Sequence, residues 1–197
     1  MATFARSAPL PERSTLVEGA QFQEIVQRSR TLVEKILQSI PDAHKSCITT
    51  ETLQLNSTEN MKLGIMASNI GIPAAPVLGG VSETLSLETR LTRMTEGLQL
   101  HRALLSAVSP RLENKDKVTA LLADIRDLVV QINKMLKMVQ AEAVVQPSPT
   151  PAALRLPGEY EVQVAAHLTL VQLQTFGQDV VRSLRSLDRS IDEETES

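Results

Sequence analysis

The sequence predicts an all-α protein that folds as a single long-chain four-helix bundle. Three observations lead to this fold class. Four long segments repeat apolar residues with the 3.6-residue period of an amphipathic helix. Two of the three links between them are long and one is short. The chain has 197 residues, 42% of them hydrophobic, which suits one domain over residues 1–197, ordered from about 14 to about 190 between flexible tails.

The first predicted helix runs from about Ser14 to Ile40. Pro41 is expected to end it, because proline lacks the N–H that a continuing helix needs. The core face at 100° per residue consists of Phe22, Ile25, Val26, Ser29, Val33, Ile36 and Ile40.

The second predicted helix begins at about Ser82, its expected N-cap, and ends at Val108 before Pro110. Its apolar residues follow the alternating 4-3 spacing of a helix–helix seam. Gly97 interrupts this helix at a cost of roughly 1 kcal/mol relative to alanine, so we expect it to serve packing. The seam consists of Leu87, Leu91, Met94, Leu98, His101, Leu105 and Val108.

The third predicted helix runs from about Lys115 to Ala143 and the fourth from about Glu159 to Leu187. The stretch from Val162 to Gln178 contains no charged residue, which predicts burial on more than one side. Parts of it alternate like strands, but its length favours a helix.

Link lengths limit the topology. The second and third helices, each roughly 40 Å long, are joined by about six residues that reach at most about 20 Å, so they must be antiparallel neighbours. The other two links each cover about 45 Å or more at about 3.1 Å per residue. They permit parallel neighbours, and the expected arrangement is up-up-down-down with two long crossover links.

Charge and residue patterns exclude several functions. Lys and Arg are scattered over a chain of net charge −3, which argues against nucleic acid. No apolar run is long enough to span or insert into a membrane. His44, in a predicted linker, His101 and His167 each lack a second ligand at helical spacing, so we expect no metal, cofactor or catalytic activity.

The residues alone do not decide whether the protein is cytosolic or secreted. The single cysteine, Cys47, allows no internal disulfide and favours a reducing compartment. Met1 to Pro11 lacks the apolar core of a signal peptide, so the chain is either cytosolic or a mature form with an added Met. Asn56 begins an N-glycosylation triplet, which mildly favours secretion.

Two polar stripes lie opposite the predicted core faces. Either stripe is a solvated helix face or part of a binding surface. Tyr160, at the start of the fourth helix, is either a packing residue or a binding anchor. The stripes consist of Gln21, Glu24, Arg28 and Lys35 on the first helix and of Asp124, Asp127 and Gln131 on the third.

Three stretches carry a family resemblance. The first contains part of a motif that consists of two cysteines, a Gly-Leu pair, an aromatic residue and a leucine. The Gly-Leu pair and the leucine are present as Gly97, Leu98 and Leu105, whereas the two cysteines and the aromatic are replaced by Gly80, Arg90 and His101. The stretches 69–78 (NIGIPAAPVL) and 167–187 (HLTLVQLQTFGQDVVRSLRSL) match more extensively. The chain thus resembles the helical cytokine family of interleukin-6 and granulocyte colony-stimulating factor, and GIPAAP favours the latter branch.

The resemblance implies roles that the residues alone do not. In this family the main receptor epitope lies on the first and third helices, where Glu24, Arg28, Asp124 and Asp127 align, with Gln21 on the same face. A second epitope near the start of the last helix uses an aromatic, here Tyr160. The family's linker disulfides are absent. Pro41 occupies the position of the cysteine that would pair with Cys47, which leaves Cys47 a free thiol able to dimerise in oxidising conditions.

The resemblance therefore implies a secreted, non-enzymatic cytokine that is a monomer when free. It would cross-link class I cytokine receptors in a 2:2 complex and drive granulocyte-lineage growth and differentiation. An interleukin-6-type cytokine is the nearest alternative. More remote alternatives are a lipid-binding helical protein and an intracellular helical adaptor.

Overall fold

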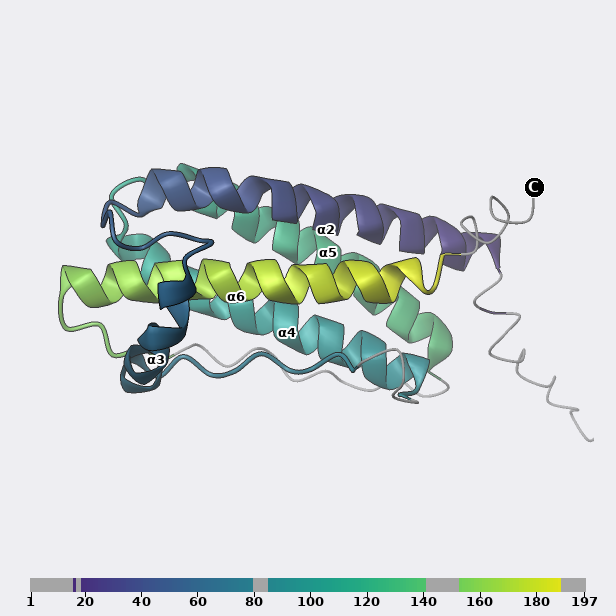
Figure 1. Cartoon of the computed structure of the whole chain (residues 1–197). Coiled ribbons are helices and arrows are strands. Elements are labelled where there is room, and N and C mark those ends of the chain that lie inside the picture. Colours follow the sequence, from purple (N-terminus) through teal and green to yellow (C-terminus); the bar gives the residue numbers. More distant parts are fainter. Residues whose placement is uncertain (1–15, 17–18, 80–84, 141–152, 189–197) are drawn as a thin grey trace, which may run out of the picture.

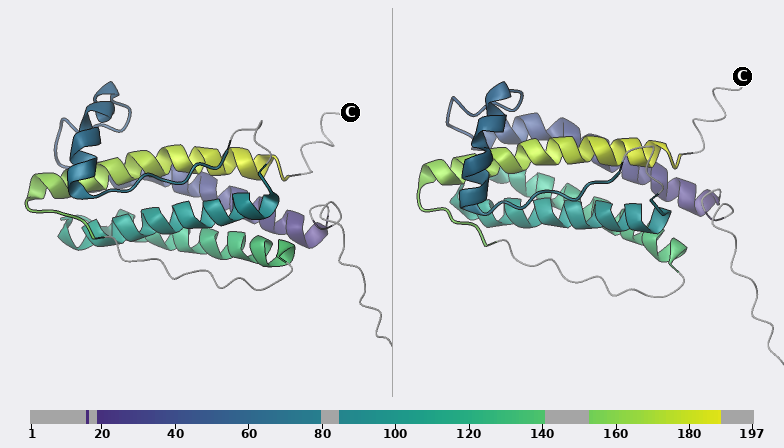
Figure 2. Two further views of the ribbon diagram at one scale, coloured as in Figure 1. Left: turned by 90° about the horizontal axis from the view of Figure 1, so that it is seen from below. Right: turned by 60° about the horizontal axis from the view of Figure 1, so that its bottom comes forward.

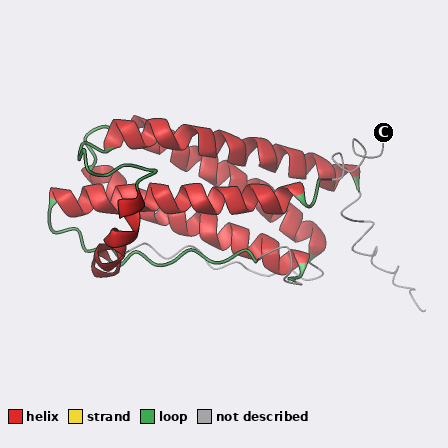
Figure 3. Ribbon diagram, viewed as in Figure 1, coloured by secondary structure: helices red, strands yellow, loops and turns green. Residues whose placement is uncertain are grey.

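Every regular element in the described part of the chain is a helix (Figures 1 and 3). The computed structural model describes residue 16 and residues 19–79, 85–140 and 153–188. The predicted all-α class is confirmed, because these residues form helices without a strand. The long helices are α2 (Ala20–Cys47), α4 (Leu87–Val108), α5 (Asp116–Val139) and α6 (Glu159–Arg185), and the short ones are η1 (Thr58–Leu63), α3 (Gly64–Ile70) and η2 (Ser109–Arg111).

Contacts between helix ends give the direction of each neighbour. Helix α6 runs antiparallel to α2, since the Gln163 amide donates to the carbonyl of Cys47 at 2.9 Å and the Gln23 amide donates to that of Leu187 at 2.9 Å. Helix α5 runs antiparallel to α4, since the Gln140 amide near the end of one lies 3.3 Å from the Glu88 carboxylate at the start of the other.

Helix α4 is also antiparallel to α6. Arg90, in the first turn of α4, donates to the Ser186 hydroxyl just beyond the end of α6, at 3.3 Å. All four long helices lie alongside one another in each view of the molecule (Figures 1 and 2). The segment after α3 returns along the bundle, where the carbonyl of Val77 accepts from Arg93 at 2.9 Å.

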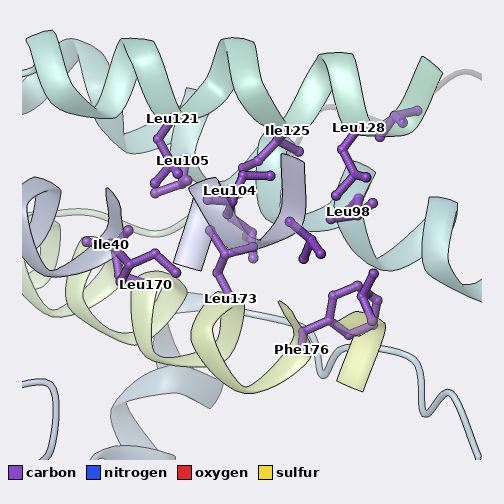
Figure 4. Packing of buried hydrophobic residues seen from close by; sticks show 14 of the residues in the cluster. Ile40, Leu98, Leu104, Leu105, Leu121, Ile125, Leu128, Leu170, Leu173 and Phe176 are labelled. Carbon is purple, nitrogen blue, oxygen red and sulfur yellow. The ribbon is translucent and has the colours of Figure 1, made fainter. Parts of the chain in front are cut away.

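The core is aliphatic and draws on all four long helices. Ile40, Leu104, Ile125 and Leu173 come from four different helices and belong to one buried hydrophobic cluster (Figure 4). Helix α6 is buried on several sides, as its lack of charge predicts: from Val162 to Leu170 every residue except Gln163 is buried. Burial of apolar surface at about 25 cal/mol per Å² supplies the main stabilisation of such a bundle.

The predicted end of the first helix is wrong. Helix α2 contains Pro41 and continues to Cys47. A proline inside a helix costs about 3 kcal/mol. The turns after it bury Ala43, His44 and Cys47 in the core, while Pro41 itself faces solvent. Tertiary packing therefore outweighs the local penalty.

Other helix ends differ by smaller amounts. Helix α4 begins at Leu87, where the hydroxyl of Ser86 accepts from the N–H of Thr89 at 3.1 Å. Ser86 is thus the N-cap, whereas the predicted cap Ser82 lies outside the described residues. Helix α2 begins at Ala20 and α6 ends at Arg185, two residues before Leu187. The predicted boundaries Ser14 and Ala143 also lie outside the described residues.

Candidate functional site

The polar stripe of α2 is exposed over its first turns. Gln21, Glu24 and Arg28 all face solvent. Arg28 donates to the Glu24 carboxylate at 2.6 Å, with both side chains 60% exposed. Water screens such a pair, so it contributes little to stability. Its charges remain available to a binding partner.

The polar stripe of α5 meets α2 through one ion pair. The Lys35 ammonium donates to Asp124 at 2.8 Å, and only 13% of the Asp124 side chain is exposed. This hydrogen bond, followed by the charges of Asp124 and Asp127, raises the pKa of Lys35. Most of the Asp124 side chain is therefore covered and paired with α2, so Asp124 contributes less exposed charge to the stripe than Asp127 does.

Asp127 is the more accessible acid of α5. Its carboxylate lies 3.2 Å from the guanidinium of Arg126, and 52% of its side chain is exposed. Gln131, one turn further on, is only partly exposed, and its side-chain oxygen is buried without a hydrogen-bond partner among the described residues. Asp127 therefore presents its charge to solvent, whereas the neutral Gln131 exposes only part of its side chain.

The two stripes form a long strip and not a compact cluster. Helices α2 and α5 run in opposite directions, because α6 opposes α2 while α4 opposes both α5 and α6. Glu24 lies three turns before Lys35, which places it roughly 16 Å along the helix from the Lys35–Asp124 pair. A partner that contacts both Glu24 and the Lys35–Asp124 pair must therefore cover several turns of α2.

Tyr160 and Asn56 are both exposed. Tyr160 is the second residue of α6, and 48% of it is exposed. Asn56 lies in a turn before η1. The hydroxyl of its neighbour Ser57 accepts from the N–H of Glu59 at 3.1 Å and caps η1. Both positions are open to another molecule.

The predicted location of His44 in a linker is wrong. His44 lies in the extended last turns of α2, buried and 2.8 Å from His167 of α6. No pattern in the sequence signals this contact, because 123 positions separate the two residues. His101 lies in the core, as its place on the seam predicts.

Sequence reasoning also missed a buried ion pair. Arg30 of α2 donates to the carboxylate of Asp188, which follows α6 and is 3% exposed. A cross-helix ion pair of this kind leaves no local signal, since both residues are ordinary charged positions in the sequence. It fixes the end of α6 against the start of α2.

Cys47 is shielded in the folded chain. It is free, 2% exposed, and burial raises the pKa of its thiol to about 11. We expect Cys47 to react with a maleimide slowly in buffer at pH 7.5 and fully in denaturant, since a buried thiol supplies little thiolate. Equal rates in both conditions would show that α2 opens at this end.

Among the described residues, no group of three or more His, Cys, Asp or Glu side chains is placed to hold a metal ion. No helix in the described part of the chain has the length and apolar character needed to cross a bilayer. Comparison of the chain with protein-family models and with curated proteins gives no match.

Proposed function

We propose that the chain is a secreted haematopoietic cytokine of the granulocyte colony-stimulating factor type. It would bind class I cytokine receptors through the α2–α5 strip and through Tyr160, and so bring two receptor chains together. Signalling for granulocyte-lineage proliferation and differentiation would then follow from the geometry of a 2:2 complex. The free protein would be a monomer.

One observation carries this proposal: exposed charge on α2 and α5 coincides with the positions that the family resemblance assigns to a receptor epitope. Glu24, Arg28 and Asp127 face solvent on two helices that the Lys35–Asp124 pair joins. Complementary charge across an interface raises the association rate and sets specificity.

The topology proposed with this function is up-up-down-down with two crossover links. The antiparallel contacts of α6 with α2 and of α4 with both α5 and α6 support it. So does the long link between α2 and α4, of which residues 71–79 run along the bundle (Figure 1). A rigid rod of this kind holds its two candidate epitopes at a fixed separation, as receptor cross-linking requires.

Charge reversal on the strip tests the proposal. Glu24→Arg and Asp127→Arg are each expected to weaken binding to the receptor ectodomain at least tenfold, about 1.4 kcal/mol, with no change in the far-ultraviolet circular dichroism spectrum. Surface plasmon resonance against the ectodomains of the granulocyte colony-stimulating factor and interleukin-6 receptors measures the effect and separates the two cytokine types.

The matched control is Glu96→Arg, the same charge change at an exposed position of α4. It is expected to bind as the wild type does. If neither receptor ectodomain binds the wild type, or if both strip variants bind with wild-type affinity, the proposed epitope is wrong.

A further inference from the structure

A chain of three side chains joins α2, α6 and η1 beneath the long link. His44 Nε2 lies 2.8 Å from His167 Nδ1, and His167 Nε2 lies 2.7 Å from the side-chain oxygen of Asn60. The Asn60 amide donates in turn to the carbonyls of Gln54 and Leu55, at 3.2 and 3.0 Å. The link is thus tied to the bundle core through hydrogen bonds.

These contacts fix the position of every shared proton. The Asn60 nitrogen already donates to two carbonyls, so its oxygen must accept from His167 Nε2–H. A neutral His167 then has a bare Nδ1, and His44 Nε2–H must donate to it. One added proton would leave an imidazolium in a buried site, with His44 accepting from it in the Nδ1–H tautomer, and a second added proton would leave two N–H groups facing each other.

The surroundings offer no charge to stabilise a protonated ring. Both histidines are buried, and neither forms an ion pair with any described residue. Of the nearby charged groups, Asp42 and Lys45 of α2 are exposed, while Glu59 and Lys62 of η1 pair with each other at 2.7 Å. Gln163 of α6 and the buried thiol of Cys47, each within one turn of these histidines along its helix, carry no charge.

We propose that the hydrogen-bonded chain His44–His167–Asn60, here called the histidine latch, is a proton-sensitive device. At neutral pH it holds residues 54–66 against the bundle. In mildly acidic surroundings it lets this segment detach while the four long helices stay folded. The inference rests on these contacts and does not depend on the proposed receptor.

The released segment has defined limits. On one side, Gln163 accepts from the N–H of Thr49 at 2.7 Å and donates to the carbonyl of Cys47, a clamp without a titrating group. On the other side, the carbonyl of Ile70 accepts from the N–H of Arg155 at 2.9 Å, and Ile70 is buried. Between these anchors the latch is the polar tie to the bundle that responds to protons.

The direction of the pH response follows from linkage. Burial lowers the pKa of His44 and, together with the charge of His44, lowers that of His167 from 6.5 to about 4. The open segment exposes the rings and therefore binds more protons than the closed one. The latch is at full strength above pH 6.5 and weakens as the pH falls from 6.5 towards about 4.

Hydrogen–deuterium exchange, corrected for intrinsic rates, tests the latch in the full chain. Between pH 7 and pH 5 the amides of residues 54–66 are expected to lose at least about tenfold in protection, since one linked proton changes an equilibrium up to about tenfold per pH unit. The amides of α5 are expected to remain more strongly protected than those of this segment at both pH values, although the whole bundle loses some stability in acid. A wild-type segment with pH-independent protection, or one whose amides exchange at the same rate as those of α5, overturns the proposal.

Two asparagine variants separate the latch from general effects of substitution. Asn60→Ala removes the link-side partner and is expected to leave residues 54–66 poorly protected already at pH 7, with little change in melting temperature. Asn69→Ala is the matched control, because Asn69 is an exposed asparagine on the same link; it is expected to behave as the wild type. Wild-type protection in Asn60→Ala would overturn the latch.

Detachment of residues 54–66 would also move two exposed apolar side chains away from the bundle. Met61 is 90% exposed and Ile65 is 76% exposed, and both lie within the part that detaches. A molecule bound to these side chains at neutral pH would be released on acidification, whereas one bound on α2 and α5 would stay.

Nitrogen NMR of the imidazoles adds an independent readout. The His167 ring is expected to be protonated at Nε2 alone at pH 7, and a proton on Nδ1 instead would contradict the latch.

Discussion

Replacing Gly97 by leucine is expected to lower the melting temperature by roughly 6–12 °C, the equivalent of about 3 kcal/mol of overpacking in a bundle of this size. A Cβ atom at this position would lie 2.1 Å from the ring tip of Phe176 and 2.5 and 2.7 Å from the adjacent ring carbons. Leucine also improves helix propensity, but by only about 1 kcal/mol, so the clash decides the sign.

The ring of Phe176 has little freedom to move aside. It is 3% exposed and packs against the imidazole of His101, with ring centroids 5.3 Å apart. The glycine at position 97 therefore leaves room in α4 for Phe176, the largest buried side chain of the last helix. This contact accounts for a glycine in the middle of an otherwise favourable helix.

A glycine in open space is the control for this prediction. At Gly64, the first residue of α3, an added Cβ would meet no atom of the described residues within 4 Å, so Gly64→Leu is expected to leave the melting temperature almost unchanged. In the double variant Gly97→Leu/Phe176→Ala, the new side chain fills the space that the ring leaves. The two effects should then be strongly non-additive. An unchanged melting temperature for Gly97→Leu, or simple additivity, would contradict this account.

Periodicity predicted the helices and their core faces well. All seven residues of the predicted first-helix face, from Phe22 to Ile40, are buried. On the second helix, the seam residues from Leu91 to Val108 are buried, and only Leu87 at its start is partly exposed. Such success is expected where one face of a long helix meets the core, because burial selects the same spacing that the sequence displays.

Helix ends were harder to predict because distant packing decides them. Pro41 is a strong local stop signal, yet it lies within α2 because Ala43, His44 and Cys47 beyond it are buried. The contact between His44 and His167 depends on that extension. A local rule cannot weigh a proline's cost against contacts with a helix more than a hundred residues away.

The sequence predicted which residues of the candidate site face solvent, but not which of them form ion pairs between helices. Spacing alone places Glu24 and Arg28 on the outer face of α2, where the structure has them. Spacing does not reveal that Lys35 reaches across to Asp124, because that contact depends on the register between α2 and α5. The receptor roles of these residues remain predictions.

Acidification from pH 7 to pH 4 is expected to cost the wild type about 3 kcal/mol of unfolding free energy through His101 alone. Burial lowers the pKa of His101 from 6.5 to about 4, although its hydrogen bond with the carbonyl of Gly97 acts in the opposite direction. Between these two pKa values His101 is therefore protonated in the unfolded chain and neutral in the folded chain. Stability is complete above pH 6.5 and is lost progressively down to about pH 4.

The surroundings of His101 explain why its protonation is unfavourable in the folded protein. His101 Nδ1 donates to the carbonyl of Gly97 at 2.6 Å, which leaves Nε2 as the bare nitrogen. Nε2 is buried and has no hydrogen-bond partner among the described residues. A proton there would create a charge without a partner in the aliphatic core, and such a charge is far more costly than the bare nitrogen.

Urea denaturation of the wild type and of His101→Leu at several pH values isolates this contribution. Leucine has a similar volume and does not titrate. The carbonyl of Gly97 lies inside α4 and keeps its place in the backbone hydrogen-bond pattern of the helix. Other groups that titrate over this range contribute equally in both proteins. The difference between the two curves is therefore the informative quantity: it should grow by about 3 kcal/mol in favour of the variant between pH 7 and pH 4, whereas parallel curves would mean that His101 is accessible to protons in the folded state.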